Sequence, residues 1–270
     1  MKRTLAALLA ALLLISLAAC DRETPPDPEQ PETPVVQEPE ETPETPDDEA
    51  PEPPTETPDP VEPADDGAAV TDNVVSGSVE ELIGYQLTMP QVDTGDQAVD
   101  QILNDYYTAA AGQLEDLCWG EVYEQALENL QAHNVTAQYT VERNGDGVLS
   151  IYRTVTVENL VTGDRQQTAH AETFQLSSGG LLTAADFFDA DEATWTARLV
   201  EQVRRAISDD PYHDQSYYPQ WSDLCASAFQ REQFYVTDEA FVVFYQPGDL
   251  GPGGQTTFAV PWSSLSDIAA

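Results

Sequence analysis

The chain has 270 residues and carries 49 acidic residues against 10 basic ones, which gives a formal net charge of −39. Binding to a phosphate backbone depends on lysine and arginine, so this balance excludes nucleic acid as a partner and favours a cationic one. A secreted surface tuned for solubility would carry the same kind of charge, so charge alone leaves both explanations open.

The first twenty residues have the layout of an export signal. Lys2 and Arg3 precede an apolar run over 5–19, which is shorter than the ~20 apolar residues of a membrane span. The run ends in Leu-Ala-Ala-Cys at 17–20. This sequence resembles the bacterial lipobox, in which the cysteine thiol takes the lipid.

The lipobox resemblance implies that residues 1–19 are removed as a lipoprotein signal peptide and that Cys20 receives a diacylglyceryl group. Two or more acyl chains anchor a protein stably where a single chain does so only marginally. The mature protein is therefore expected at the extracellular face of a bacterial cell membrane, held there by lipid. An uncleaved anchor and an ordinary secretory signal are the alternatives.

Residues 20–75 are predicted to be a disordered acidic linker rich in Pro, Glu and Thr. Over 21–66 these residues and Asp dominate, Arg22 is the only basic residue, and no aromatic side chain occurs. Such a segment cannot bury enough apolar surface to offset the entropy of ordering, and proline and charge repulsion keep it extended. At ~3.1 Å per residue its full reach is on the order of 140 Å.

The composition changes over 76–270, where aromatic and β-branched residues appear and proline becomes rarer. Its 195 residues suit one domain or two small ones in close contact. Alternating patterns predict strands at 85–89, 135–142, 148–158 and 167–176. A helix is expected over 96–133 with a break at Gly120, and Asn-Gly-Asp-Gly at 144–147 is typical of a hairpin turn.

The second half of this region shows similar patterns. A helix is expected from an acidic cap at Asp191 to Ser208, and a short helix over 223–229 follows an aromatic loop. Further strands are expected at 234–236, 240–245 and 256–260. The sequence therefore predicts an α+β fold with antiparallel sheets, in two meanders, packed with helices. Its subdomains are expected over about 76–165 and 166–270.

Two further cysteines, Cys118 and Cys225, each follow a leucine on a helical stretch. An exported protein meets oxidising conditions, so an even pair indicates a disulfide. Closing a loop of about 100 residues would contribute roughly 4.7 kcal/mol in the entropy model. Two buried apolar thiols are the alternative.

The sequence contains no recognisable catalytic pattern. It lacks a Gly-x-Ser-x-Gly elbow and a His-Glu-x-x-His motif, and His133, His170 and His213 are far apart in sequence. A crowded acidic loop at 209–214 is better explained as solvated surface than as a cation site. We therefore expect a binding protein and not an enzyme, with no cofactor and no metal site.

The best binding candidates lie on the aromatic loop over 210–221. They are Tyr212, Tyr217, Tyr218 and Trp221. Such side chains stack on sugars or anchor protein partners, although they also serve to cap a core under a long loop. His170, inside a strand pattern, is a further candidate, with a structural role as the alternative.

Residues 234–265 resemble the C-terminal domain of the RsiV-like anti-sigma family, the domain of unknown function 3298. They contain a strand, an acidic turn, an apolar strand, a Pro and Gly loop, and a final strand that runs into Pro-Trp-Ser-Ser-Leu. Residues 170–188 are similar to the first half of that domain, and 85–104 to its companion, the domain of unknown function 4163. The family's Gly-Gly before its histidine is replaced by Gln-Thr-Ala at 167–169, and its Pro-Tyr by Gln-Pro-Gly at 246–248.

This resemblance implies an extracellular binding or sensory domain, because the known member of the family binds lysozyme outside the cell. The anti-sigma segment and the spanning helix have no counterpart here, so signalling through a sigma factor is not expected. The expected partner is a cationic, lysozyme-like protein or peptidoglycan. An accessory role in peptidoglycan modification and a structural envelope role without a soluble ligand are the alternatives.

Overall fold

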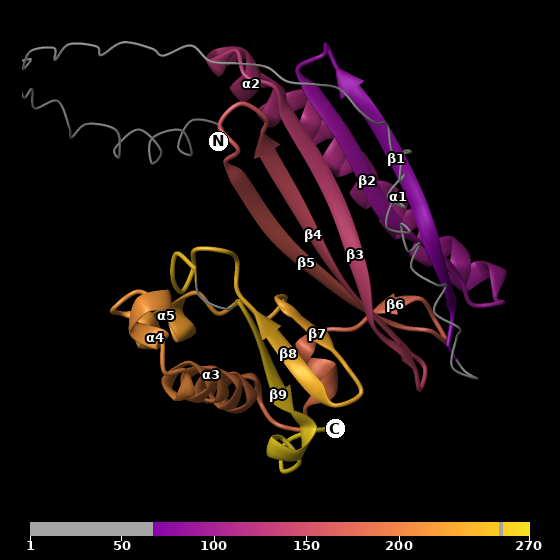
Figure 1. Ribbon diagram of the computed structural model, residues 1–270. Helices are drawn as coiled ribbons and strands as arrows, with labels where there is room; N and C mark the ends of the chain where they lie inside the picture. Colours follow the sequence, from indigo (N-terminus) through magenta and orange to yellow (C-terminus); the bar gives the residue numbers. More distant parts are fainter. Residues whose placement is uncertain (1–66, 254–255) are drawn as a thin grey trace, which may run out of the picture. The chain divides into compact units, whose positions relative to one another are not determined.

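The computed structural model describes residues 67–253 and 256–270 (Figure 1). The expected signal peptide at 1–19, the lipidation site Cys20 and the linker as far as residue 66 lie outside the described residues. Within the described residues, no helix combines the length and the hydropathy that crossing a membrane requires.

The N-terminal half is built on a six-stranded sheet. Its strands are β1 (Ala69–Val79), β2 (Ile83–Asp93), β3 (His133–Gly145), β4 (Val148–Asn159), β5 (Arg165–Gln175) and β6 (Gly180–Leu181). They lie in sequence order, and every neighbouring pair is antiparallel except β2 and β3. The expectation of purely antiparallel sheets is wrong at this pair. Helix α1 (Gln97–Leu117) carries the chain back along the sheet, and such a crossover returns the next strand in parallel.

Helix α1 packs on one face of this sheet. The Asp96 carboxylate caps its first turn by accepting a hydrogen bond from the Ala98 backbone N–H at 2.8 Å. Its buried residues recur every fourth position and join the core of the sheet: Val99, Leu103, Tyr107 and Ala111. A π-helical segment, Cys118–Val122, and helix α2 (Tyr123–Asn129) follow. The break predicted at Gly120 therefore takes the form of a π-helical turn.

The C-terminal half contains a three-stranded antiparallel sheet of β7 (Phe234–Val236), β8 (Ala240–Phe244) and β9 (Thr257–Pro261). A 3-10 turn at Ala184–Phe187 and the helices α3 (Glu192–Asp209), α4 (His213–Ser216) and α5 (Trp221–Ser227) precede it, and a 3-10 turn at Trp262–Ser264 follows. All five residues of β8 are buried. One face of β8 packs into the core with α3, and the other faces the first sheet.

Each half has its own hydrophobic core. The first combines aliphatic side chains of the strands with α1, and the second combines the rings of the C-terminal half with α3. Both cores are made of residues between Ala68 and Ala269. The chain shortened to residues 67–270 therefore keeps every described residue of the two cores.

The two halves meet where β4 faces β7 and β8. The Tyr152 ring of β4 lies 5.1 Å from the Tyr235 ring and 5.4 Å from the Phe244 ring, measured between centroids. The backbone N–H of Val236 donates to the buried Ser150 hydroxyl at 3.0 Å. Aromatic packing and a buried backbone hydrogen bond therefore join the two sheets.

Two predicted boundaries are wrong. The sequence predicts a linker as far as residue 75, but β1 begins at Ala69 and pairs with β2 along its whole length. Most of its side chains are exposed, so they do not show the apolar alternation that predicts a strand. The predicted subdomain boundary at 165/166 cuts off β5, which pairs with β4 and places Phe174 and Leu176 in the first core. The boundary lies after β6 instead.

Candidate functional site

Arg153 on β4 and Glu172 on β5 form a buried ion pair on the sheet face that α1 covers. The Arg153 Nε–H donates to Glu172 Oε2 at 3.0 Å, and its Nη2 donates to Oε1. This bidentate geometry is the one in which a guanidinium binds a carboxylate most strongly. Burial alone would lower the pKa of Arg153, but the hydrogen bonds and charge of Glu172 outweigh it and raise that pKa.

Two tyrosines of α1 close over this ion pair. The Tyr106 hydroxyl donates to Glu172 Oε1 at 3.4 Å, and the Tyr107 ring lies 5.8 Å from the Arg153 guanidinium carbon. Burial raises the pKa of Tyr106 to about 12, and the charge of Glu172 adds to this effect. Tyr106 therefore remains a donor at neutral pH. The buried Tyr107 hydroxyl has no hydrogen-bond partner among the described residues.

His170 lies directly across the strand pair from Arg153. The residue is exposed at the surface of β5. Partial loss of water around the ring and the nearby Arg153 charge lower its pKa, with Glu172 opposing them. The imidazole is therefore neutral at physiological pH, next to the ion pair rather than part of it. In the part of the chain that the structure describes, no three His, Cys, Asp or Glu side chains gather closely enough to hold a metal ion.

A cavity of about 460 Å³ opens beside Glu172 and receives side chains from both halves. Tyr106, Ala171 and Thr173 line it from the first half, and Trp195 and Phe234 line it from the second. A larger hollow of about 580 Å³ lies over α3 but is a shallow groove. We prefer the cavity beside Glu172, because a concave site with an apolar lining and a few convergent polar groups is typical of ligand binding.

One arginine lies between two glutamates at the edge of this cavity. Arg231 is 3.1 Å from the Glu192 carboxylate and 3.0 Å from the Glu232 carboxylate. All three side chains are exposed and line the cavity. Since Arg153 already neutralises Glu172, these three residues give the lining a net charge of one carboxylate, and the cavity favours neutral or basic ligand groups.

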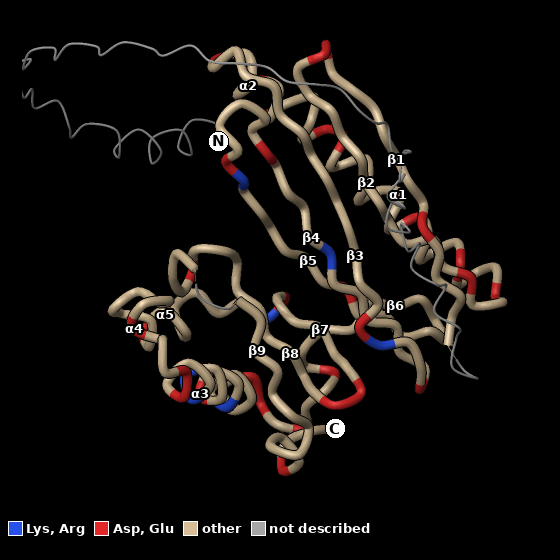
Figure 2. Tube along the Cα trace, in the orientation of Figure 1, with Lys and Arg blue, Asp and Glu red and all other residues tan. Residues whose placement is uncertain are grey.

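The end of the first sheet near α2 and the β1–β2 turn is strongly acidic. Its five exposed glutamates, which we call the acidic end, are Glu80, Glu81, Glu121, Glu124 and Glu128. None of them lies within ion-pair distance of an arginine or histidine among the described residues. Figure 2 shows acidic residues on α2 and on the β1–β2 turn. Glu80 and Glu81 also have positive φ angles of 45° and 61°.

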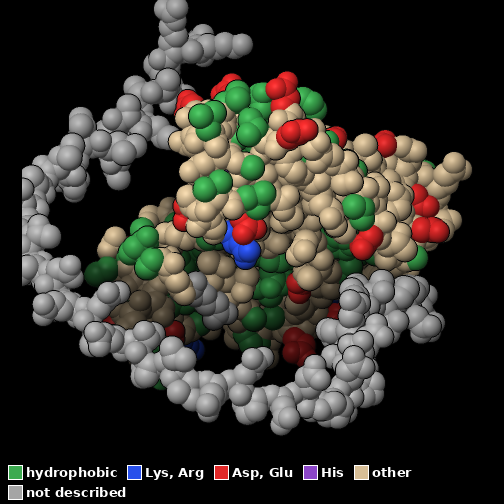
Figure 3. All heavy atoms as spheres, turned by 45° about the horizontal axis from the view of Figure 1, so that its top comes forward, with side chains coloured by type: hydrophobic (Ala, Val, Ile, Leu, Met, Phe, Trp, Pro, Cys, Tyr) green, Lys and Arg blue, Asp and Glu red, His purple; other side chains and the backbone are tan. Residues whose placement is uncertain are grey.

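Apolar side chains are exposed beside the acidic end. Leu127 is 45% exposed, Leu130 82%, Leu160 58% and Val161 65%. The backbone N–H of Leu160 donates to the Ala132 carbonyl at 2.8 Å, so the β4–β5 turn adjoins the connection from α2 to β3. Figure 3 shows hydrophobic side chains among acidic ones on the end that this view brings forward. Exposed apolar residues with a polar rim are typical of protein-binding surfaces.

The aromatic loop contributes more to the core than to the surface. Tyr217 is 6% exposed and belongs to the second core, so the prediction that it contacts a partner is wrong. Trp221 packs against the same core, with its ring 6.0 Å from that of His213. Tyr218 is half-buried and its backbone N–H bonds to a neighbouring loop. Of the four aromatic candidates, Tyr212 is the exposed one, at 64%.

Cys118 and Cys225 are free thiols, so the predicted disulfide is wrong. Cys118 packs in the first core and Cys225 in the second, where each serves as a small apolar side chain. Burial is the main effect that raises the pKa of each thiol to about 11. Both thiols therefore remain protonated and unreactive near neutral pH.

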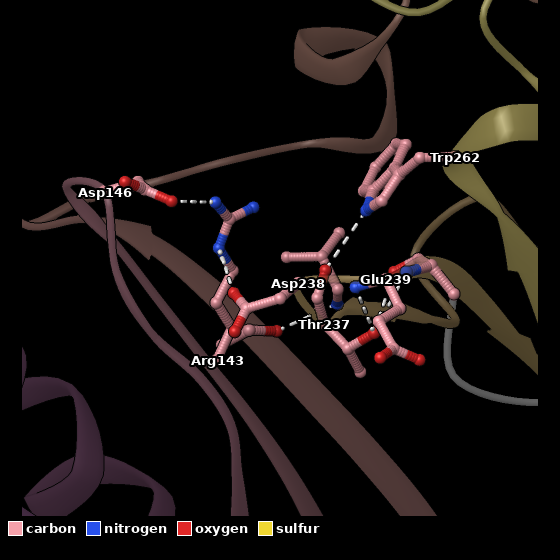
Figure 4. A network of polar contacts seen from close by, with 9 residues as sticks. Arg143, Asp146, Thr237, Asp238, Glu239 and Trp262 are labelled. Carbon is pink, nitrogen blue, oxygen red and sulfur yellow. Dashed lines mark hydrogen bonds and ion pairs between the residues drawn. The ribbon is translucent and has the colours of Figure 1, made fainter. Parts of the chain in front are cut away.

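The Pro-Trp-Ser-Ser-Leu motif at 261–265 holds the β7–β8 turn in place (Figure 4). The Trp262 indole N–H donates to the Thr237 carbonyl at 3.1 Å. On the other side, Arg143 Nε lies 3.3 Å from the Asp238 carboxylate, and its Nη2 lies 2.9 Å from Asp146. The β7–β8 turn is therefore hydrogen-bonded to the C-terminal segment and forms an ion pair with Arg143 near the end of β3.

These features define an α+β protein of two sheets, each with its own core, and a cavity to which both halves contribute. Residues 185–263 match the family described as "Protein of unknown function (DUF3298)". The chain thus contains a DUF3298 domain, which covers most of the C-terminal half. No curated protein matches the chain.

Solved structures of this family share the fold. A DUF3298 family member from Bacteroides fragilis is 13% identical, with a TM-score of 0.56 over 76% of this chain and 95% of that one. A DUF3298 family protein from Pseudomonas aeruginosa is 14% identical, with a TM-score of 0.52 over 76% of this chain and 96% of that one. The likeness extends upstream of residue 185, because 76% of the chain is much longer than the matched segment.

The ion pair of Arg153 and Glu172 was not predicted from the sequence, although the sequence contains a signal for it. Arg153 lies between Ile151 and Val155 on the apolar face of β4. Glu172 takes the same face of β5 as Phe174. A charged residue in register with buried apolar ones, on two neighbouring strands and with opposite signs, indicates a buried pair.

Proposed function

We propose that this protein is an exported, lipid-anchored binding protein that captures a cationic protein, such as a lysozyme, or a component of the cell wall. It acts by binding and not by catalysis. Residues 85–104 are part of the same proposal, as the counterpart of the domain of unknown function 4163 in an RsiV-like ectodomain. The DUF3298 domain at 185–263 supports this assignment, since an RsiV-like relative binds lysozyme outside the cell.

Uncompensated negative charge carries the proposal. Residues 73–270 contain 30 acidic and seven basic residues, for a net charge of −23. Six of the seven arginines are already within ion-pair distance of a carboxylate. Those pairs use eight carboxylates, which leaves 22 without an arginine among the described residues. A surface of this kind attracts a cationic partner and speeds its association.

The acidic end is the surface where we place this partner. Its five glutamates supply long-range attraction, and Leu130 and Val161 supply exposed apolar contacts close to them. Charge steers the encounter and apolar contacts that become buried slow the dissociation, so both together give a specific complex. Strand β1 begins at the opposite end of the sheet, where Ala69 pairs with Asp93.

Binding of hen lysozyme to residues 67–270 at low and at physiological salt tests this proposal. We expect saturable binding whose association rate falls steeply with salt, because exposed charges are screened over about 8–10 Å. Changing the five glutamates of the acidic end to glutamine should abolish it. A control variant changes five exposed carboxylates elsewhere to amides: Glu201, Asp209, Asp214, Asp223 and Glu239. Equal loss in both variants would mean that net charge acts without a site, and no saturable binding would overturn the proposal.

The lipid anchor is tested separately by changing Cys20. The Cys20→Ala variant should accumulate as an unprocessed precursor or appear in the medium, because the thiol that takes the lipid is missing. Cys118→Ala, which removes a buried thiol of the folded part, should leave the location unchanged. Cell fractionation distinguishes these outcomes. A Cys20→Ala protein that stays membrane-bound at its mature size would contradict the anchor.

A further inference from the structure

Strand β5 has an outer edge that β6 covers only in part. β6 pairs with Phe174 and Gln175 alone, and the next residue, Leu182, donates its backbone N–H to the Thr173 carbonyl at 2.7 Å. The chain then leaves the sheet for the C-terminal half. An unpaired strand edge is a template for another strand, so folded proteins normally cover or blunt it.

At Ala169, four residues before Thr173, a side chain takes the place of the missing strand. The Ala169 backbone N–H donates to Gln246 Oε1 at 2.9 Å, and Gln246 Nε2 donates to the Ala169 carbonyl at 2.8 Å. The carboxamide of Gln246 thus bonds to both backbone groups of one residue, as a residue of a neighbouring strand would. This contact shows that the β5 edge accepts a peptide-like group.

Ala171 lies between these two covered positions and is itself uncovered. The β4–β5 register runs from 148 to 158 without a bulge, so outward-facing backbone groups alternate along β5. Since Ala169 and Thr173 face outward, the N–H and C=O of Ala171 do so as well. Neither group bonds to another residue in the part of the chain that the structure describes. Ala171 lines the cavity of about 460 Å³ described above.

We propose that this slot binds an external peptide segment in extended conformation, as a short added strand paired with Ala171. The inference adds a second, distinct site to the proposed binding protein and does not depend on binding at the acidic end. Glu192 and Glu232 outnumber Arg231 at the cavity edge, and this excess of one negative charge favours a peptide with neutral or basic side chains. The same charges disfavour the acidic residues 21–66 of this chain as the occupant.

The test uses acetyl-Ala-Lys-Ala-amide, titrated into isotope-labelled residues 67–270 and followed by the backbone amide signals. Saturable shifts are expected at Ala171 and Thr173. The same peptide N-methylated at lysine should bind roughly tenfold more weakly, because it loses one backbone donor. Acetyl-Ala-Glu-Ala-amide should also bind more weakly than the lysine peptide. If no saturable shifts occur, or if they lie on β1 instead, the proposal is overturned.

Two variants and one matched control locate the site. Ala171→Pro removes the outward donor without removing a ladder hydrogen bond, as edge strands tolerate, and should abolish binding. Gln167→Pro makes the same change at an outward position of β5 that does not line the cavity, and should bind normally. Ala185→Phe fills the cavity from an exposed position and should also block binding, which covers the case in which the proline variant fails to fold.

The same variants distinguish the slot at Ala171 from the acidic end. The variant with five glutamines at the acidic end should keep its affinity for the peptide while it loses lysozyme. Unchanged peptide binding in both Ala171→Pro and Ala185→Phe would overturn the slot and leave the proposed function standing. Loss of lysozyme binding in both Ala171→Pro and Ala185→Phe would mean that the lysozyme site lies at the slot, and would overturn the claim that the two sites are distinct.

Discussion

The two halves of the molecule bury apolar surface in different ways. The first spreads its core along strands of eleven to thirteen residues and one long helix. The second has strands of three to five residues and depends on stacked rings, with Phe188 on Trp195 at 5.4 Å and Phe234 on Phe241 at 5.0 Å. A short sheet offers little area for each strand, so a few large side chains must supply it. The second half is therefore the one that should fail when a single side chain is removed.

The largest effect is expected from Trp195→Ala, in the second core. Trp195 is 2% exposed, and removal of a buried tryptophan typically costs about 3–5 kcal/mol of unfolding free energy. Leu103→Ala, fully buried in the first core, should cost less, at about 2–3 kcal/mol. Urea unfolding followed by circular dichroism measures both values. Trp119→Ala, at 57% exposure, is the control and should change little. A larger loss from Leu103→Ala would contradict the comparison.

Glu172→Ala tests the buried ion pair of the first half. It leaves the Arg153 guanidinium buried without its carboxylate, and we expect a loss of about 3 kcal/mol. Replacing both partners together, as Arg153→Met with Glu172→Leu, should cost far less, because no charge is then left buried. If the double variant is as unstable as the single one, packing rather than charge explains the loss.

Ser150→Ala tests the contact between the halves. The Ser150 hydroxyl accepts from the Val236 N–H and lies 2.9 Å from the Thr173 hydroxyl. Its removal leaves buried groups without a partner, which costs about 1–3 kcal/mol. Thr154→Ala, on the same face of β4 but half-exposed, is the control. A broadened unfolding transition, rather than a single shifted one, would show that this contact couples the two halves.

Acid should weaken the second half. The pKa values of Asp186 and Asp191 are lowered by the backbone hydrogen bonds of Thr183 and Thr194, and that of Asp267 by Arg198. A depressed carboxyl contributes stability above its unfolded pKa and loses it as pH falls through the folded one, so the loss begins near pH 3.8 and deepens below it. Tryptophan fluorescence, which comes largely from the second half, should report this loss as the pH falls below 3.8. A fluorescence signal that stays unchanged as the pH falls below 3.8 would contradict this prediction.

The smallest perturbation comes from labelling the two native thiols. Both have a pKa of about 11, so at pH 8 a thiol reagent reaches them only after local opening. Cys118 reports on the first core and Cys225 on the second. We expect Cys225 to react faster, because the shorter strands around it open more easily. Equal rates would show that the two halves open as one unit.

Much of the fold could be read from local patterns. The strands from β2 to β5, the Asp191 cap of α3 and the three strands of the second sheet follow alternation and capping, which a single segment displays. The parallel pairing of β2 with β3 depends on the α1 crossover, which no local pattern states. Strand β1 was not predicted, because its exposed polar residues resemble the linker that precedes it.

The sites were harder to predict, because they depend on what the chain brings together. Tyr217 and Cys225 share a core that forms only when α4 and α5 fold onto β8 and β9, so a loop pattern wrongly suggested a surface tyrosine and a bridge. The slot at Ala171 exists because β6 is short and Gln246 reaches the β5 edge from 77 residues away. Neither residue type signals such a role in the sequence.

The β1–β2 turn has a consequence for engineering. Its Leu82 N–H bonds to the Val79 carbonyl at 3.0 Å across Glu80 and Glu81, whose positive φ angles match the turn type that normally carries Asn-Gly. Two like-charged glutamates in left-handed backbone destabilise the hairpin turn that they form. Replacing Glu80 with Asn and Glu81 with Gly should stabilise the hairpin and raise the melting temperature. The same change removes two of the five charges of the acidic end. Thermal stability and partner capture are thus set against each other at the same two positions.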